Sequence, residues 1–220
     1  MSSSEHSATA RAPQRERGRQ RVADLLQAAS AVFAEKGYAA ATMTEIAARA
    51  DAPIGSLYQF FPNKELLGDA LMHRYGERAV AALESIEKKL PALSASELAD
   101  ALLHVFADLR SERAAVRALM DASPHLADAR GGEFRRGVLA VIARILKACA
   151  PRLPAERIDA LALLVLLQMK AGIGLLDLRA DPARTAGTQR ELRQMLAAHL
   201  AESLGLTIGR ATKKAGTRAR

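Results

Sequence analysis

Apolar residues recur at three- and four-residue spacing along most of this 220-residue chain. The first clear case is the stretch 19–36, where one face of a helix would carry Val22, Leu25, Leu26, Ala29, Val32 and Phe33. This period is typical of an amphipathic helix, because side chains of a strand alternate with a period of two. No segment shows a strand pattern, and aromatic residues make up only 4% of the chain. The sequence therefore predicts an all-α fold.

About nine helices follow from the same criterion, with proline, glycine and polar residues between them. They cover approximately residues 19–36, 42–51, 53–61, 64–90, 95–109, 113–122, 133–150, 155–178 and 187–204. Residues 1–18 are polar and lack periodicity, so they are expected to form a flexible basic arm.

The net charge of +8 is confined to the two ends of the chain. Residues 1–21 hold five arginines against two glutamates, and residues 209–220 hold five basic residues and no acidic one, whereas residues 22–208 sum to zero. Basic tails suit contacts with phosphates, because each neutralised phosphate releases counterions. The tail 209–220 is predicted to be disordered, and its charge serves either DNA binding or solubility.

Several classes of protein are disfavoured by what the sequence lacks. Cys149 is the single cysteine and lies in an apolar helical run, so a buried thiol in a reducing cytosol is expected rather than a disulfide. The N-terminus has no apolar signal segment, and the stretch 161–178 contains Gln168, Lys170 and Asp177, which makes it too polar for a membrane span. A soluble cytoplasmic protein without membrane contact is expected.

The sequence shows no pattern typical of a catalytic or metal-binding site. The five histidines have no metal-ligand spacing, and the chain has no glycine-rich phosphate loop and no paired nucleophile and base. We therefore expect no enzymatic activity, no metal and no cofactor.

Two short helices at 42–51 and 53–61 are joined by a tight turn and preceded by the helix 19–36. Thr42 and Glu45 form a capping-box pattern, in which each side chain accepts from the other residue's backbone N–H. Pro53 suits the first turn of the second short helix, and Asn63 suits the N-cap of the long helix that follows. This order of elements is typical of a DNA-binding helix-turn-helix, whose second helix enters the major groove.

The side chains expected to face outward on this motif are small or hydrogen-bonding. Gly55 and Ser56 permit close approach to phosphate, and Gln59 suits an adenine edge. Tyr58 and Lys64 are expected to donate to the sugar-phosphate backbone, and Thr42 and Thr44 to touch it as well. Leu57 and Phe61 are expected to anchor the second short helix inward.

The stretch 21–67 resembles the DNA-binding domain of the TetR/AcrR family of transcriptional regulators. The residues that carry the resemblance are Ala28-Ala29, Phe33 to Tyr38, Thr42, Ile46-Ala47, Ala50, Gly55 to Tyr58, Phe60-Phe61 and Asn63 to Leu67. Asp51 departs from the family's usual glycine, although aspartate tolerates a left-handed turn. Pro53 departs from the usual serine or threonine cap.

The resemblance implies a set of DNA-facing residues: Thr42, Met43, Thr44, Gly55, Ser56, Tyr58, Gln59, Phe60 and Lys64. The alternative for Tyr58 and Phe60 is packing within the small domain, and for Met43 and Thr44 it is a plain surface position.

The resemblance further implies a helix-turn-helix domain at 19–66 and a helical effector-binding and dimerisation domain at 67–208. The helices 155–178 and 187–204 would pair with their copies in a homodimer; the alternative is a core helix within one chain. Polar residues in apolar surroundings, His104, His125 and Gln168, are the candidates for an effector pocket, or else are ordinary satisfied or exposed side chains.

The implied function is a repressor that leaves a palindromic operator when a small-molecule effector binds. In that scheme the ligand tilts the helix 64–90 and moves the two recognition helices away from a spacing of about 34–36 Å. The alternative is an effector-independent or activating helical DNA-binding protein.

One feature of the charge is unusual for a DNA-binding domain. Residues 22–75 hold four basic and six acidic side chains, a net charge of −2. A DNA-binding surface ordinarily has a positive electrostatic footprint. We therefore hypothesise that the arginines at 11–21 supply much of the attraction to phosphate, with entry into the adjacent minor groove as a further possibility.

Overall fold

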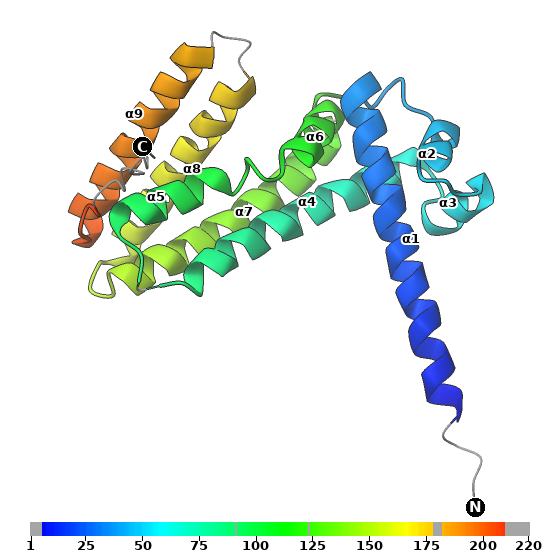
Figure 1. Ribbon diagram of the computed structural model, residues 1–220, viewed down its shortest axis with the longest axis horizontal. Helices are drawn as coiled ribbons and strands as arrows, with labels where there is room; N and C mark the ends of the chain where they lie inside the picture. Colours follow the sequence, from blue (N-terminus) through cyan, green and yellow to red (C-terminus); the bar gives the residue numbers. More distant parts are fainter. Residues whose placement is uncertain (1–5, 91, 123, 178–181, 210–220) are drawn as a thin grey trace, which may run out of the picture. The chain divides into compact units, whose positions relative to one another are not determined.

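The computed structural model describes residues 6–90, 92–122, 124–177 and 182–209, without the side chains of residues 6–15, 111, 124–130, 176, 177 and 182. The described residues form nine helices and no strand, which confirms the predicted all-α fold (Figure 1). The helices are α1 (His6–Lys36), α2 (Met43–Arg49), α3 (Ile54–Phe60), α4 (Lys64–Glu87), α5 (Ala95–His104), α6 (Arg110–Ala122), α7 (Pro124–Cys149), α8 (Ala155–Asp177) and α9 (Pro182–Leu204).

Three helices begin earlier than their apolar periodicity predicted. Helix α1 begins at His6 rather than residue 19, α7 at Pro124 rather than 133, and α9 at Pro182 rather than 187. The apolar stripe marks only part of each helix, whereas a helix that is already nucleated continues through turns that lack such a stripe in the sequence. Proline is tolerated in the first turn of α7 and α9, where its missing N–H has no helical partner.

Other boundaries moved by a few residues. Helix α5 ends at His104 instead of 109, α6 begins at Arg110 instead of 113, and α4 ends at Glu87 instead of 90. Gly131, predicted to separate two helices, lies inside α7, where glycine costs about 1 kcal/mol relative to alanine. A Cβ at Gly131 would lie 3.8 Å from the Met120 methyl, so this position faces a packed neighbour.

The chain divides into two compact units, and the first comprises residues 1–77 and 110–134. Helix α1 packs along α6 and against α2 in this unit. Gly37 ends α1 with a φ of 80°, as its left-handed C-cap predicted, and Tyr38 packs edge-on against Phe33 with ring centroids 5.2 Å apart. Because α6 packs on α1, the first unit extends beyond the helix-turn-helix domain expected at 19–66.

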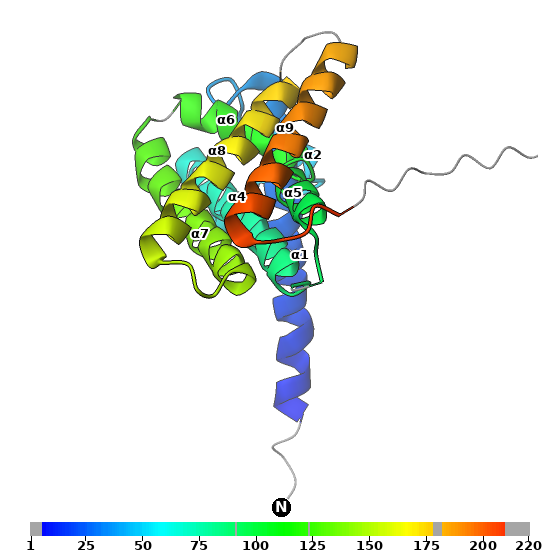
Figure 2. The same ribbon diagram turned by 90° about the vertical axis from the view of Figure 1, so that its left-hand side faces the viewer.

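The second unit comprises residues 78–109 and 135–220. Helices α8 and α9 run antiparallel side by side, and α5 packs against α9 (Figure 2). The backbone N–H of Ala95 donates to the carbonyl of Thr207 at 2.9 Å, which ties the start of α5 to the segment after α9. The predicted tail 209–220 lies outside the described residues apart from Gly209.

Helix α8 presents an apolar face that this protomer leaves open. Leu163, Leu164 and Leu167 are each about half exposed, with Leu167 at 52%. The segment Ala155–Leu175 is the one stretch of the described residues long and apolar enough, by length and composition, to cross a membrane, although core helices of soluble proteins pass the same test. A face of this kind usually packs against another apolar surface.

Candidate nucleic-acid interface

Helix α2 begins with the capping box that the sequence predicted. The Thr42 hydroxyl accepts from the Glu45 backbone N–H at 3.2 Å, and the Glu45 carboxylate accepts from the Thr42 backbone N–H at 3.1 Å. Hydrogen bonds from Lys36, and then from Thr42, lower the pKa of Glu45. The carboxylate is therefore charged at neutral pH, and it holds the start of α2 in place.

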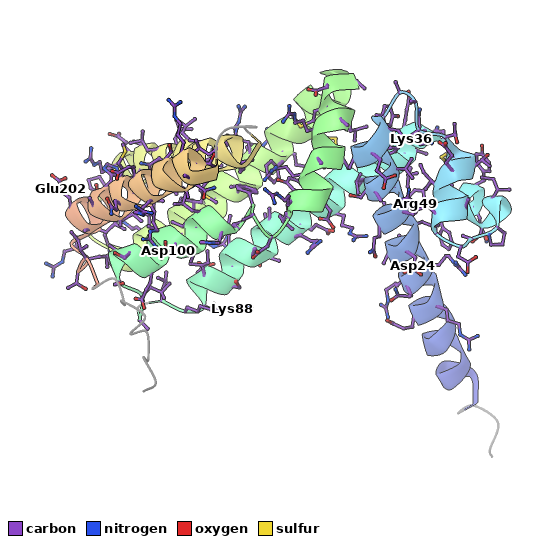
Figure 3. The ribbon with its side chains drawn as sticks, turned by 45° about the horizontal axis from the view of Figure 1, so that its top comes forward. Asp24, Lys36, Arg49, Lys88, Asp100 and Glu202 are labelled. Atoms are coloured by element: carbon purple, nitrogen blue, oxygen red, sulfur yellow. The ribbon has the colours of Figure 1, made fainter. Side chains whose placement is uncertain are left out.

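Two ion pairs join α2 to α1, and Figure 3 labels their basic members, Lys36 and Arg49. Lys36 pairs with Glu45. The two terminal nitrogens of the Arg49 guanidinium, Nη1 and Nη2, donate to the two carboxylate oxygens of Glu35 at 2.8 and 2.6 Å. The hydrogen bond from Arg49 is the main cause that lowers the pKa of Glu35. Bidentate pairs fix orientation as well as distance, so α2 is held in a defined position on α1.

A left-handed residue makes the turn between α2 and α3. Asp51 has a φ of 47°, which confirms the left-handed turn predicted at this departure from the family pattern. The Ala52 N–H donates to the Ala47 carbonyl at 3.0 Å. The Arg21 guanidinium donates to the Asp51 carbonyl over a long 3.5 Å, so a residue of α1 reaches the turn itself.

Helix α3 has one anchored face and one open face. Leu57 and Phe61, the residue that follows α3, are buried and hold it against the unit, as predicted. Tyr58 is 48% exposed, and its neighbours Gly55 and Gln59 are exposed as well. A Cβ at Gly55 would meet nothing within 4 Å, so another molecule can approach the backbone closely there. Helix α3 therefore presents hydrogen-bonding groups on a surface shaped for a groove.

Most of the residues predicted to face DNA are exposed, and one is not. The exposed ones are Thr42, Thr44, Gly55, Tyr58, Gln59 and Phe60, whereas Ser56 is half-buried. Met43 is only 9% exposed, so its predicted place on the DNA-facing surface is wrong. It is the first residue of α2 and shares a helix face with Ile46 and Ala47, both of which are buried.

Lys64, predicted to donate to the sugar-phosphate backbone, makes hydrogen bonds within the protein in this structure. Its ammonium donates to the carbonyls of Tyr38, Ala39 and Ala41 at 2.8, 3.1 and 2.9 Å. It also lies 4.7 Å from the centroid of the Tyr38 ring. A lysine has three N–H donors, so all of them are directed at the loop between α1 and α2. Lys64 stabilises that loop.

All four basic side chains of residues 22–75 have partners within the protein. Lys36 and Arg49 pair with glutamates, and Lys64 binds the loop carbonyls. Arg74 donates to the Ala23 carbonyl at 3.0 Å and to Glu112 at 3.2 Å, where the Glu112 side chain is only 6% exposed. The helix-turn-helix thus has little free positive charge of its own.

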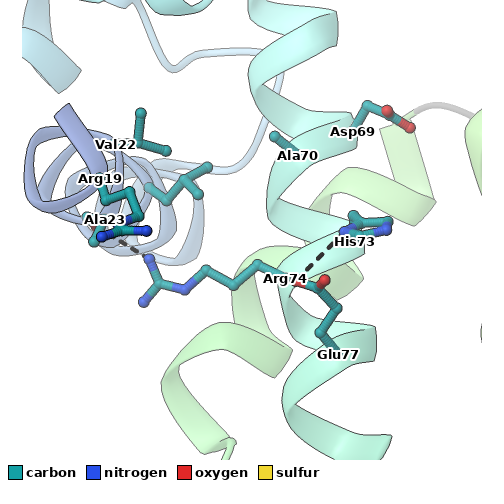
Figure 4. Close-up of a pocket in the computed structure, with 9 residues that line it drawn as sticks. Arg19, Val22, Ala23, Asp69, Ala70, His73, Arg74 and Glu77 are labelled. Carbon is teal, nitrogen blue, oxygen red and sulfur yellow. Dashed lines mark hydrogen bonds and ion pairs between the residues drawn. The ribbon is translucent and has the colours of Figure 1, made fainter. Parts of the chain in front are cut away.

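An open pocket of about 480 Å³ lies between α1 and α4 (Figure 4). His73 lies 3.5 Å from Glu77 along α4, and Arg74 crosses to the Ala23 carbonyl of α1. The nine lining residues are Arg19, Val22, Ala23, Leu26, Asp69, Ala70, His73, Arg74 and Glu77. Charged side chains of both signs line this pocket.

The predicted effector residues fall in different environments. His104 is exposed on α5, with its Nδ1 2.7 Å from the Asp100 carbonyl, and the His125 side chain lies outside the described residues. The Gln168 amide oxygen on α8 is buried and has no hydrogen-bond partner among the described groups. Of the three candidates, Gln168 has the environment expected of a pocket residue.

Two further buried polar atoms in the second unit belong to residues that the sequence did not single out. Asp100 Oδ1 on α5 and His199 Nε2 on α9 also have no hydrogen-bond partner among the described groups. They lie on helices that pack with α8. His199 could have been found because it lies three residues after Leu196 and beside Leu200, on the buried stripe of α9. No group of three or more His, Cys, Asp or Glu among the described residues is arranged to hold a metal ion.

Family models match an N-terminal and a C-terminal part of the chain. The model of a family described as "Bacterial regulatory proteins, tetR family" matches residues 25–71, and that of a "Tetracyclin repressor-like, C-terminal domain" matches residues 94–200. No curated protein matches the sequence.

Solved structures resemble most of the chain. A bacterial regulatory protein in the tetR family from Rhodococcus RHA1 is 26% identical, with 87% of this chain and 98% of that chain covered and a TM-score of 0.56. Salmonella enterica GusR is 22% identical, with 84% and 96% covered and a TM-score of 0.64. The regulator FadR from Bacillus subtilis, solved with stearoyl-CoA, is 17% identical, with 80% and 97% covered and a TM-score of 0.61.

Proposed function

Because the chain belongs to the TetR family of bacterial regulatory proteins, and is thus a DNA-binding transcriptional regulator, we propose that it acts in the cytoplasm as a homodimeric repressor of a palindromic operator. The observation that carries this proposal is the open face of α3, where Gly55, Tyr58 and Gln59 are exposed while Leu57 anchors the helix from behind. Direct reading of bases requires such a face, and phosphate contacts alone carry no sequence information. We propose that the protein has no enzymatic activity.

We propose a DNA-facing set that is narrower than the one the sequence alone suggested. We propose that Tyr58 and Gln59 contact the bases or sugar-phosphate backbone in the major groove, and that Thr42 and Thr44 contact phosphates at the start of α2. Phe60 is exposed beside them and is kept in the set, as are Gly55 and Ser56. Met43 and Lys64 are left out, because one is buried and the other binds loop carbonyls.

Paired substitution in α3 tests the DNA-binding part of the proposal. We expect Tyr58→Ala with Gln59→Ala to abolish preference for the operator over a scrambled duplex in a fluorescence anisotropy titration. Arg152→Ala, at an exposed site in the turn before α8, is the control and should leave the preference unchanged. Undiminished operator affinity in the paired variant would contradict the proposal.

We propose that two copies of the chain form the homodimer through the apolar face of α8. Leu163, Leu164 and Leu167 lie within one turn on this face, and Met195 on the neighbouring α9 is 62% exposed. We expect Leu167→Glu to convert a dimer to a monomer in analytical ultracentrifugation. Leu66→Glu is the matched control, since Leu66 is 49% exposed but lies on α4 in the first unit. A monomeric wild-type protein would contradict the proposed dimer.

We propose that a small molecule releases the protein from DNA, and that it binds to the buried polar groups of Gln168, Asp100 and His199. A buried acceptor without a partner is costly, and a ligand that donates hydrogen bonds would remove that cost. The FadR relative was solved with stearoyl-CoA, and we propose that this chain likewise binds a small organic effector in its second unit.

The small-molecule fraction of a bacterial cell extract is the probe for this proposal. We expect it to weaken operator binding by the wild type but not by Gln168→Leu, which retains the side-chain volume and removes the acceptor. Equal weakening in both proteins would exclude Gln168 as the contact. No weakening in either would favour the alternative, an effector-independent or activating regulator.

A further inference from the structure

The N-terminal part of α1 holds the positive charge that the helix-turn-helix lacks. Residues 6–21 contain five arginines and one glutamate, a net charge of +4, while residues 22–75 carry a net charge of −2. The four basic side chains of residues 22–75 all have partners inside the protein, as described above. Within residues 6–75 the net positive charge therefore lies in residues 6–21, which we call the basic extension.

The basic extension is a continuation of α1 and not a separate arm. The helix runs without a break from His6 to Lys36, and its N-terminal half extends away from α2 and α3 in two perpendicular views (Figure 1 and Figure 2). Its sixteen residues span about 24 Å at 1.5 Å per residue. This length corresponds to about seven base pairs at 3.4 Å each.

The base of the extension lies at the helix-turn-helix itself. Arg21 donates to the carbonyl of Asp51, the left-handed residue in the turn between α2 and α3. Arg17 and Arg19 are exposed on the turn of α1 that precedes it, where Arg19 also forms an exposed ion pair with Glu16. A molecule that contacts α3 is therefore within reach of the first arginines of the extension.

We propose that the basic extension is a second DNA-binding element, which contacts phosphates of the duplex beside the groove that α3 reads and supplies most of the electrostatic attraction of the protein for DNA. This inference rests on the proposed function, since it takes the DNA to lie against α3. Arginine suits the role because its planar guanidinium binds phosphate with two parallel hydrogen bonds.

An anionic membrane is a less suitable partner for the same charge. Helices that lie on membranes have a large apolar face, which enters the boundary between headgroups and acyl chains. Between residues 6 and 21 the apolar residues are three alanines and Pro13, and the first large aliphatic side chain is Val22. The extension therefore has the charge to bind a polyanion but lacks the apolar face to enter a lipid surface.

The test replaces four arginines and retains the fifth. The variant Arg11→Gln, Arg15→Gln, Arg17→Gln and Arg19→Gln keeps residues of high helix propensity and leaves Arg21 on the turn. Operator affinity is measured by fluorescence anisotropy between 50 and 300 mM KCl. A control with the same loss of charge replaces four exposed residues of the second unit: Lys88→Gln, Lys89→Gln, Arg152→Gln and Arg157→Gln.

Each arginine that contacts a phosphate contributes about 0.9 to the slope of log affinity against log salt. The variant is expected to lose up to about 3.6 from the slope per protomer, and about eightfold in affinity per lost contact at 0.1 M salt. The control variant is expected to keep the wild-type slope. Hydroxyl-radical footprints of the wild type should extend about seven base pairs beyond those of the variant on each side.

Several results would overturn the inference. An unchanged slope in the extension variant would show that these arginines make no phosphate contact. An equal loss of slope in the control would attribute the effect to net charge rather than to contact. Unchanged DNA binding with loss of binding to vesicles of phosphatidylcholine and 30% phosphatidylglycerol would assign the extension to membranes.

The same titrations separate this inference from the proposed function. Phosphate contacts carry no sequence information, so the extension variant should keep its preference for the operator over a scrambled duplex. The paired Tyr58 and Gln59 substitution should lose that preference and keep most of the salt slope. Thermal melting followed by circular dichroism checks that the variants are folded.

Discussion

Replacing Lys64 with methionine distinguishes the role that the structure gives this residue from a role as a phosphate contact. Methionine retains the apolar stem and removes the ammonium that binds three loop carbonyls. A hydrogen bond to a charged group contributes about 1.5–3 kcal/mol. The three bonds share one ammonium, and water can reach the carbonyl of Ala39, so their contributions do not add in full.

We therefore expect Lys64→Met to lower the free energy of unfolding by about 2–3 kcal/mol, including about 0.5–1 kcal/mol from the lost contact with the Tyr38 ring. The operator affinity should fall, because the loop positions the start of α2, but the salt slope should stay the same. If Lys64 instead contacted a phosphate, the slope would fall by about 0.9.

Urea denaturation followed by circular dichroism measures the first quantity, at a fixed protein concentration because dimerisation changes apparent stability. Lys89→Met, at an exposed lysine in the turn after α4, is the control and should leave stability unchanged. Wild-type stability in Lys64→Met together with a reduced salt slope would refute the reasoning.

Three further predictions concern stability and reactivity. Glu112→Gln should lower the free energy of unfolding by about 2–3 kcal/mol, since it leaves the partly buried Arg74 without its counter-charge. Glu16→Gln, which removes the exposed ion pair with Arg19, should change it by less than about 1 kcal/mol. Equal urea midpoints of the two variants would contradict this difference. Asp51→Gly should raise the free energy of unfolding by up to about 1 kcal/mol, because glycine adopts a positive φ without strain; a lower urea midpoint would count against that account. Burial raises the pKa of the Cys149 thiol, so its reaction with a disulfide reagent at pH 8 should be slower than that of free cysteine and should accelerate as the pH rises; a rate equal to that of the free amino acid would show that the thiol is not shielded.

The sequence alone determined the helical class and the local geometry of the DNA-binding motif. Period-3.6 apolar stripes, the capping box of Thr42 and Glu45, and the left-handed positions at Gly37 and Asp51 are all present as predicted. These features depend on interactions within a few residues, so the local sequence is sufficient to specify them. It did not specify the start of α1, because the first turns of this helix have no apolar stripe in the sequence.

Tertiary structure decided which polar groups are available for function. Lys64 looks like a phosphate contact in the sequence, but its partners lie 23 to 26 residues away in the loop between α1 and α2. The burial of Met43, the pair of Arg74 with Glu112 and the unpaired atoms of Asp100, Gln168 and His199 likewise depend on segments that meet only in the folded chain. The energy of a charged or polar group is set by its neighbours in space, and a linear pattern does not contain them.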